Sequence, residues 1–92
     1  NDNVALSVMR AIQDFGLSVP EDISVVGMGG LPNSQYSSPQ LTTIKIPLYE
    51  IGAKAVETVL TTKDYPNTVE KLLFSTEIRE GSSVKSIISN EK

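Results

Sequence analysis

The run Ile23-Ser-Val-Val26, followed by Gly27, is the stretch of sequence that decides the fold. It is short, apolar and rich in β-branched residues, which is typical of a strand buried on both faces of a sheet. The glycines that follow it, together with Pro32, predict a sharp end to this strand. A strand of this kind needs helices packed on the sheet, so the run indicates an α/β protein.

Further strands and a long helix follow along the chain. Residues 41–46, rich in Thr and Ile, and the less apolar residues 71–78 predict two more strands. Residues 33–40 are polar and predict a loop or a short helical turn. A helix over residues 48–61 begins after Pro47, where the missing N–H costs nothing. Its wide apolar face consists of Leu48, Ile51, Ala55, Val56, Val59 and Leu60.

Another helix opens the chain, between the cap-forming Asn1-Asp-Asn3 and a stop at Gly16. A helical wheel predicts that the core face of this helix consists of Val4, Ala5, Val8, Ala11, Ile12 and Phe15. Leu6 does not fit, because it projects from the polar side between Gln13 and Arg10. Either it is a single exposed leucine, which is unremarkable in a monomer, or a partner covers it. The whole pattern is α-β-β-α-β, with a parallel or mixed sheet.

The composition excludes several classes of function. The 92 residues contain no Cys and no His, which excludes a disulfide framework, a Cys/His zinc site and a His-based catalytic triad. The net charge is −3 and the eight basic residues are scattered, whereas a surface that grips phosphates needs clustered Lys and Arg. No apolar run approaches membrane-spanning length. We therefore expect no metal, no cofactor, no membrane contact and no DNA contact from this segment.

The order of several motifs is more specific than any one of them. Residues 19–27, Val-Pro-Glu-Asp-Ile-Ser-Val-Val-Gly, and residues 41–44, Leu-Thr-Thr-Ile, are the most specific. Asn1-Asp2 opens the first helix, Glu50-Ile-Gly52 lies in the second, and Ile78-Arg-Glu-Gly-Ser82 lies near the end. In this order and spacing they resemble the LacI/GalR family of transcriptional repressors along most of the chain.

The resemblance implies a fragment of an effector-binding domain with the type I periplasmic-binding-protein-like fold. Residues 1–83 would form the C-terminal part of that domain, residues 48–61 would pack with its N-terminal lobe, and residues 84–92 would be a tail. The fragment would hold parts of two lobes and expose apolar faces that seek partners. The resemblance also implies a cytoplasmic homodimer that is not an enzyme and that binds operator DNA only through a domain absent from this chain.

The resemblance further implies a small effector in the cleft between the lobes, with a sugar as the expected class. Asn1 matches a family position that can reach the ligand, since an amide both donates and accepts; the alternative is that Asn1 only caps the helix. After Gly27, family members commonly have an aromatic residue and then an acid that binds paired hydroxyls, but here Met28 and Gly29 stand there. Either the effector differs, another group supplies this contact, or no such polyol is sensed.

For the dimer, the resemblance implies an interface made by the opening helix and the loop before residue 41. Carried over, this interface consists of Leu6, Arg10, Gln13 and Tyr36. The misfit of Leu6 on the helical wheel supports it. The alternative for Tyr36 is a ring partly buried under its own loop.

Three other interpretations compete with a fragment of a LacI/GalR-type repressor. A periplasmic sugar-binding protein of a transport system shares the fold, and a signal peptide in place of a helix-turn-helix would identify it. The glycines from Gly27 to Gly30 suggest a phosphate-binding loop, but no Gly-Lys-Ser/Thr follows them. Glu21 and Asp22 form a carboxylate pair, but acids there fit a solvated loop before a strand, so we expect no enzyme.

Overall fold

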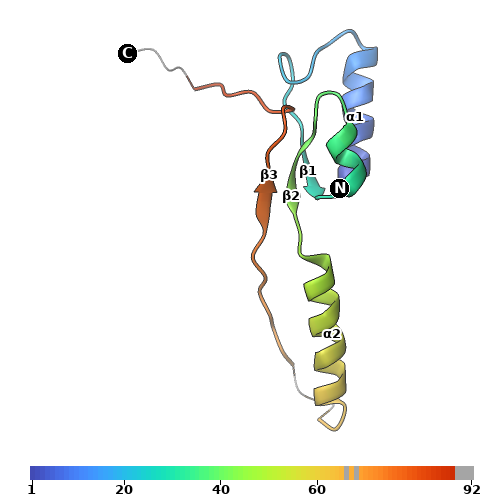
Figure 1. Cartoon of the computed structure of the whole chain (residues 1–92), viewed down its shortest axis with the longest axis vertical. Coiled ribbons are helices and arrows are strands. Elements are labelled where there is room, and N and C mark those ends of the chain that lie inside the picture. The colour runs from blue at the N-terminus through green and yellow to red at the C-terminus, as the bar shows by residue number, and fades with distance from the viewer. Residues whose placement is uncertain (66, 68, 89–92) are drawn as a thin grey trace.

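The chain forms a three-stranded sheet with one helix packed on it and a second helix held away from it (Figure 1). The computed structural model of the chain describes residues 1–65, 67 and 69–88. The elements in chain order are α1 (Asp2–Asp14), β1 (Val26–Gly29), the 3-10 helix η1 (Pro32–Tyr36), β2 (Thr42–Lys45), α2 (Leu48–Thr62) and β3 (Glu77–Arg79). The predicted order of helices and strands is confirmed, and η1 is the short helical turn expected between the first two strands.

The sheet is mixed, which is one of the two arrangements, parallel or mixed, that the sequence predicts. β1 pairs with β2 in parallel, and β2 pairs with β3 in antiparallel orientation. Thr43 is the register partner of both Gly27 and Arg79, so these three residues share one face of the sheet, the face that α1 covers. The alternate residues lie on the other face, which α1 does not cover: Val26, Met28, Ile44 and Ile78.

Two of the predicted strands are displaced from their expected positions. The first was expected over residues 23–26 but occupies Val26–Gly29. A Cβ at Gly27 would lie only 2.4 Å from Oδ1 of Asp2, so the glycine permits pairing at this point instead of ending the strand. The third, expected over residues 71–78, is only Glu77–Arg79. It pairs with the end of β2, and beyond Lys45 the chain turns into α2 and offers no strand for residues 71–76.

The predicted core face of α1 is wrong in part. The buried residues of this helix are Asp2, Ala5, Met9 and Ile12, while Val4 is 59% and Phe15 86% exposed. The buried face is rotated from the predicted one by roughly 100°, the angle between successive residues. A helical wheel gives the density of apolar side chains but not the direction of the sheet, and here the sheet lies under Met9. Leu6 flanks this face and packs against the core, so it is not an exposed misfit.

The core is completed by the segments that connect the elements. Val19, Val25 and Leu41 join the buried residues of α1. The chain after β3 also contributes. Ser83 is fully buried, and its Oγ accepts from the Thr42 N–H at 2.9 Å and donates to the Val25 carbonyl at 2.6 Å. Of the tail predicted over residues 84–92, residues 89–92 lie outside the described residues.

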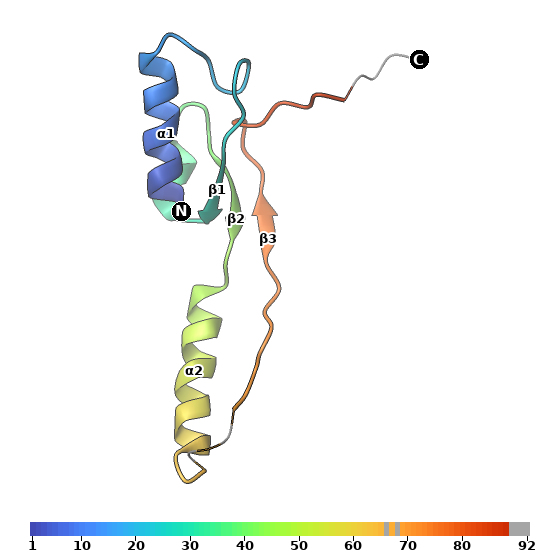
Figure 2. The same ribbon diagram turned by 180° about the vertical axis from the view of Figure 1, so that it is seen from behind.

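α2 stands apart from this core, as the two views in Figures 1 and 2 show. None of its residues is buried, so its apolar face is exposed as the sequence predicts. The radius of gyration is 18.6 Å, whereas a compact chain of this length has about 12 Å. Among the described residues, no helix is long and apolar enough to span a membrane. The chain is therefore an extended unit in which β2 and β3 connect a small core to a separate helix.

Candidate functional site

The N-terminus of α1 lies beside the carboxyl end of β1 (Figures 1 and 2). Because β1 and β2 are parallel, both strands end at this same edge of the sheet. Ligands of open α/β sheets bind outside the carboxyl ends of the strands, so this edge is the candidate site. Asn1 lies here and caps α1, since its Oδ1 accepts from the Val4 N–H at 3.0 Å. Within the described part of the chain, its Nδ2 makes no hydrogen bond and is free to donate to a ligand.

The next residue, Asp2, is buried completely, and both oxygens of its carboxylate accept hydrogen bonds. Oδ1 accepts from the Thr43 hydroxyl at 2.6 Å. Oδ2 accepts from the Leu31 N–H at 2.8 Å and from the Ser34 hydroxyl at 2.9 Å. Three elements besides α1 therefore meet at one carboxylate: the turn after β1, η1 and β2.

Two further donors reach this carboxylate through the hydroxyls. The Thr43 hydroxyl accepts from the Gly30 N–H at 3.2 Å while donating to Asp2. The Ser34 hydroxyl accepts from the Arg79 guanidinium while donating to Asp2. Arg79 also donates to the carbonyls of Gly30 at 3.5 Å and Leu31 at 3.3 Å. We call these side chains the Asp2 network; its members are Asp2, Ser34, Thr43 and Arg79.

The Asp2 network keeps its central carboxylate charged. Burial raises the pKa of Asp2, but the hydrogen bonds from Thr43, the Leu31 N–H and Ser34, with the charge of Arg79, lower it by more. The resulting pKa lies below the ordinary value for an aspartate. Asp2 is thus an ionised internal acceptor with no lone pair directed to solvent. Among the described residues, no group of three or more acidic, His or Cys side chains is placed to hold a metal ion.

The turn that these side chains surround contains the glycines noted in the sequence. Gly29 and Gly30 have φ values of +129° and +66°, which side chains rarely adopt. At Gly30 a Cβ would lie 2.9 Å from Cγ of Lys45, whereas at Gly29 the space is open. The absence of an acid at residue 29 therefore accompanies a backbone conformation that would strain any other residue there. Met28, also a predicted ligand contact, is exposed on the sheet face that α1 does not cover.

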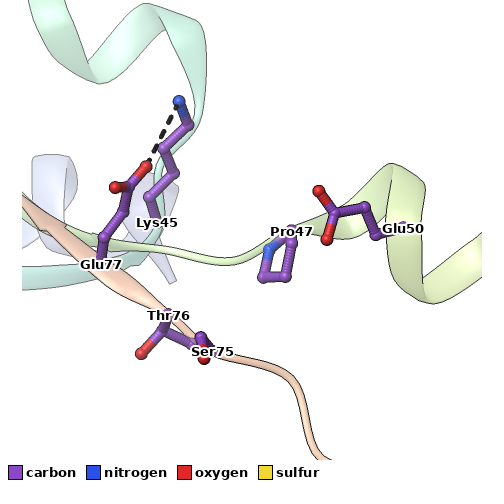
Figure 3. Close-up of a pocket in the computed structure, with 6 residues that line it drawn as sticks. All are labelled: Lys45, Pro47, Glu50, Ser75, Thr76 and Glu77. Carbon is purple, nitrogen blue, oxygen red and sulfur yellow. Dashed lines mark ion pairs between the residues drawn. The ribbon is translucent and has the colours of Figure 1, made fainter.

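A polar hollow of about 310 Å³ adjoins the end of β2, where the strands meet α2 (Figure 3). It is lined by Lys45, Pro47, Glu50, Ser75, Thr76 and Glu77. Lys45 and Glu77, whose Nζ and Oε1 lie 4.0 Å apart, are on the strand side, and Glu50 approaches from α2. Its volume is at the lower end of the range for small-molecule sites. The sequence prediction assigned no site role to these residues or to Arg79, although Glu50 and Arg79 lie in the motifs that carry the resemblance.

The predicted dimer residues lie mostly on one surface. Gln13 donates to the Ser38 carbonyl at 3.3 Å, which holds α1 against the segment after η1. Arg10, one turn earlier on the same side of α1, is exposed and pairs with Asp14 at 3.0 Å. Tyr36 ends η1 and is 85% exposed, so its ring is not buried under its own loop. Leu6, by contrast, packs partly into the core of its own chain.

The model of the periplasmic binding protein-like domain matches residues 1–84. The chain belongs to this family, and to the LacI-type repressors within it. It is 40% identical over 86 residues to the "Probable HTH-type transcriptional repressor ExuR" of Bacillus subtilis, covering 92% of this chain and 26% of that protein. The resemblance inferred from the sequence motifs is thereby confirmed.

Solved structures of LacI-type repressors have the same fold. A lac repressor dimer bound to operator and the anti-inducer ONPF matches with a TM-score of 0.83 and 32% identity, over 94% of this chain and 30% of that one. A LacI family regulator from Enterococcus faecium with bound ribose matches with a TM-score of 0.77 and 28% identity, over 91% of this chain and 32% of that one. The chain thus spans between a quarter and a third of these proteins. All three relatives are transcription regulators.

Proposed function

We propose that this chain is the effector-sensing and dimerising part of a LacI-type transcriptional repressor. The observation that carries the proposal is the amide of Asn1 at the strand-end edge, whose Nδ2 makes no hydrogen bond within the described residues. The family supports it, and two of its members were solved with a small molecule bound, one of them ribose. Operator DNA would be bound by another domain, since the basic residues of this chain are scattered.

The effector we propose is a sugar held by neutral donors and backbone groups at this wall. Asp2 is fully buried and Gly29 has no side chain, so neither of these two residues offers a carboxylate to paired hydroxyls. Asn1 then supplies the hydrogen bonds, while Met28 and Gly29 shape the adjoining surface. The ligand hydroxyls that an acid holds in related proteins would here meet the backbone of the turn or the hollow beside Lys45.

The sensing mechanism follows from the path of the chain. β2 and β3 connect the core to α2, whose uncovered apolar face we assign to the N-terminal lobe. Effector binding between the lobes would change the angle between the core and α2, with β2 and β3 as the connection. In a dimer this change alters the spacing of the DNA-binding domains, and hence the affinity for the operator.

Calorimetric titration of the protein that contains this chain tests the proposal, with D-ribose and a set of other monosaccharides as probes. The decisive variant is Asn1→Asp, which keeps the Oδ1 that caps α1 and removes the Nδ2 donor. We expect at least one sugar to bind and the variant to weaken its binding about tenfold, the value of roughly one lost hydrogen bond. Asn67→Ala, a change in an exposed loop, is the control and should bind normally. Absence of binding by every sugar, or equal binding by Asn1→Asp, refutes the proposed site.

A further inference from the structure

The four backbone polar groups of Gly30 and Leu31 are all bound by side chains from other elements. The Gly30 N–H is bound by Thr43 of β2 and the Leu31 N–H by Asp2 of α1. The carbonyls of both residues are bound by Arg79 of β3. The Leu31 carbonyl also lies 3.2 Å from the Ser34 N–H and 2.7 Å from the Ser34 hydroxyl, so the first turn of η1 and the Asp2 network together set the position of this turn.

Two members of this network come from the strands that lead to α2. Thr43 and Arg79 are register partners across β2 and β3, and both project toward the turn. The two strands therefore hold the turn from the same side, one at an N–H and the other at two carbonyls. Asp2 connects them through two hydroxyls. The Thr43 hydroxyl donates to Asp2 and accepts from the Gly30 N–H of the turn. The Ser34 hydroxyl donates to Asp2 and accepts from Arg79.

From this arrangement we infer that Asp2 and Arg79 are positioning residues that join the turn at residues 29–31 to the strand pair β2–β3, so that the turn and the strands move as one body. The joint itself is independent of any ligand. Its consequence for sensing rests on the proposed function: a change in the angle between the core and α2 is transmitted directly to the wall beside Asn1. Arg79 suits this role because its planar fork binds two carbonyls and a hydroxyl together, which a lysine cannot do.

Amide hydrogen exchange of the chain, followed residue by residue by NMR without effector or DNA, tests this joint. In Arg79→Lys we expect the amides of Gly30 and Leu31 to exchange at least tenfold faster, measured relative to Ile12 in the buried face of α1. Arg10→Lys, the same substitution at an exposed arginine, should leave these ratios unchanged. Equal acceleration at Ile12 and at the turn would mean that Arg79 only stabilises the whole fold, and would overturn the inference.

A second variant covers the case in which Arg79→Lys does not fold. Ser34→Ala removes the hydroxyl that links Arg79 to Asp2 and that also contacts the Leu31 carbonyl at 2.7 Å, while Asp2 stays bonded to Thr43 and to the Leu31 N–H. We expect a smaller acceleration, about threefold, at Gly30 and Leu31, with Ile12 unchanged. Unchanged exchange at the turn in this variant contradicts the joint. Because no ligand is present, this failure is distinct from a failure of the sugar titration, which concerns the proposed function alone.

Discussion

Replacing Thr43 by valine removes one hydroxyl from the centre of the Asp2 network while keeping the shape of the side chain. Thr43 is fully buried, and its hydroxyl donates to Asp2 at 2.6 Å and accepts from the Gly30 N–H at 3.2 Å. Losing a hydrogen bond to a buried charge costs roughly 1.5–3 kcal/mol, and leaving an N–H unpaired adds about 1 kcal/mol. We therefore expect Thr43→Val to lower the free energy of unfolding by about 3 kcal/mol.

Thr43→Ser is the matched control, because it keeps the hydroxyl and loses only a methyl group. Its expected cost is about 1 kcal/mol. Urea denaturation followed by circular dichroism measures both variants against the wild type, with equal slopes required for the comparison. The reasoning is refuted if Thr43→Val is as stable as Thr43→Ser, because hydrophobic packing and not the hydrogen bonds would then dominate at this position.

Three other predictions follow from close contacts and buried charge. Gly27→Ala should destabilise the fold by about 2 kcal/mol or more, since its Cβ would lie 2.4 Å from Oδ1 of Asp2. Gly52→Ala in α2 is the control. A Cβ there has nothing within 4 Å, so this variant should be neutral or stabilising in the same denaturation assay. The lowered pKa of Asp2 contributes stability that is complete above the pKa of the unfolded state, about 3.9, and is lost as the pH falls through the pKa of the folded state. The free energy of unfolding of Asp2→Asn should therefore fall less steeply on acid titration than that of the wild type. Parallel plots of the free energy of unfolding against pH would contradict this. Ser83→Ala should cost about 2 kcal/mol, because its two hydrogen bonds join the last segment to β2 and to Val25, whereas Ser7→Ala, on the exposed side of α1, should change little.

The order of elements and the extent of α2 could be predicted from sequence because they depend on local signals. Pro47 marks the start of α2, and its 15 residues carry an apolar face whether or not anything covers it. The buried face of α1 could not be predicted in this way. Val4 and Val8 are as apolar as Met9, and only the position of the sheet decides which of them is buried.

The Asp2 network was also beyond the reach of local patterns. The sequence suggested Asp2 as a possible cap and Arg79 as part of a terminal motif, 77 positions away along the chain. Aspartate side chains are rarely buried, so a position at a helix cap predicts that the side chain of Asp2 is exposed. Its burial depends on the strand shift at Gly27, which in turn depends on the absence of a side chain there. Gly27, which the sequence predicts to end the strand, is the residue whose missing side chain leaves room for the Asp2 carboxylate.

The oligomeric state of this chain, measured by light scattering, tests most directly the claim that it carries the dimer surface of a LacI-type repressor. The variant is Tyr36→Glu, because Tyr36 is exposed beside α1, whereas Leu6 also serves the core. Tyr49→Glu is the control, since Tyr49 is equally exposed but lies on α2. We expect a wild-type dimer that Tyr36→Glu converts to a monomer and Tyr49→Glu leaves intact. A dimer that survives Tyr36→Glu and is lost in Tyr49→Glu would show that the copies meet through α2, and would contradict the assigned interface.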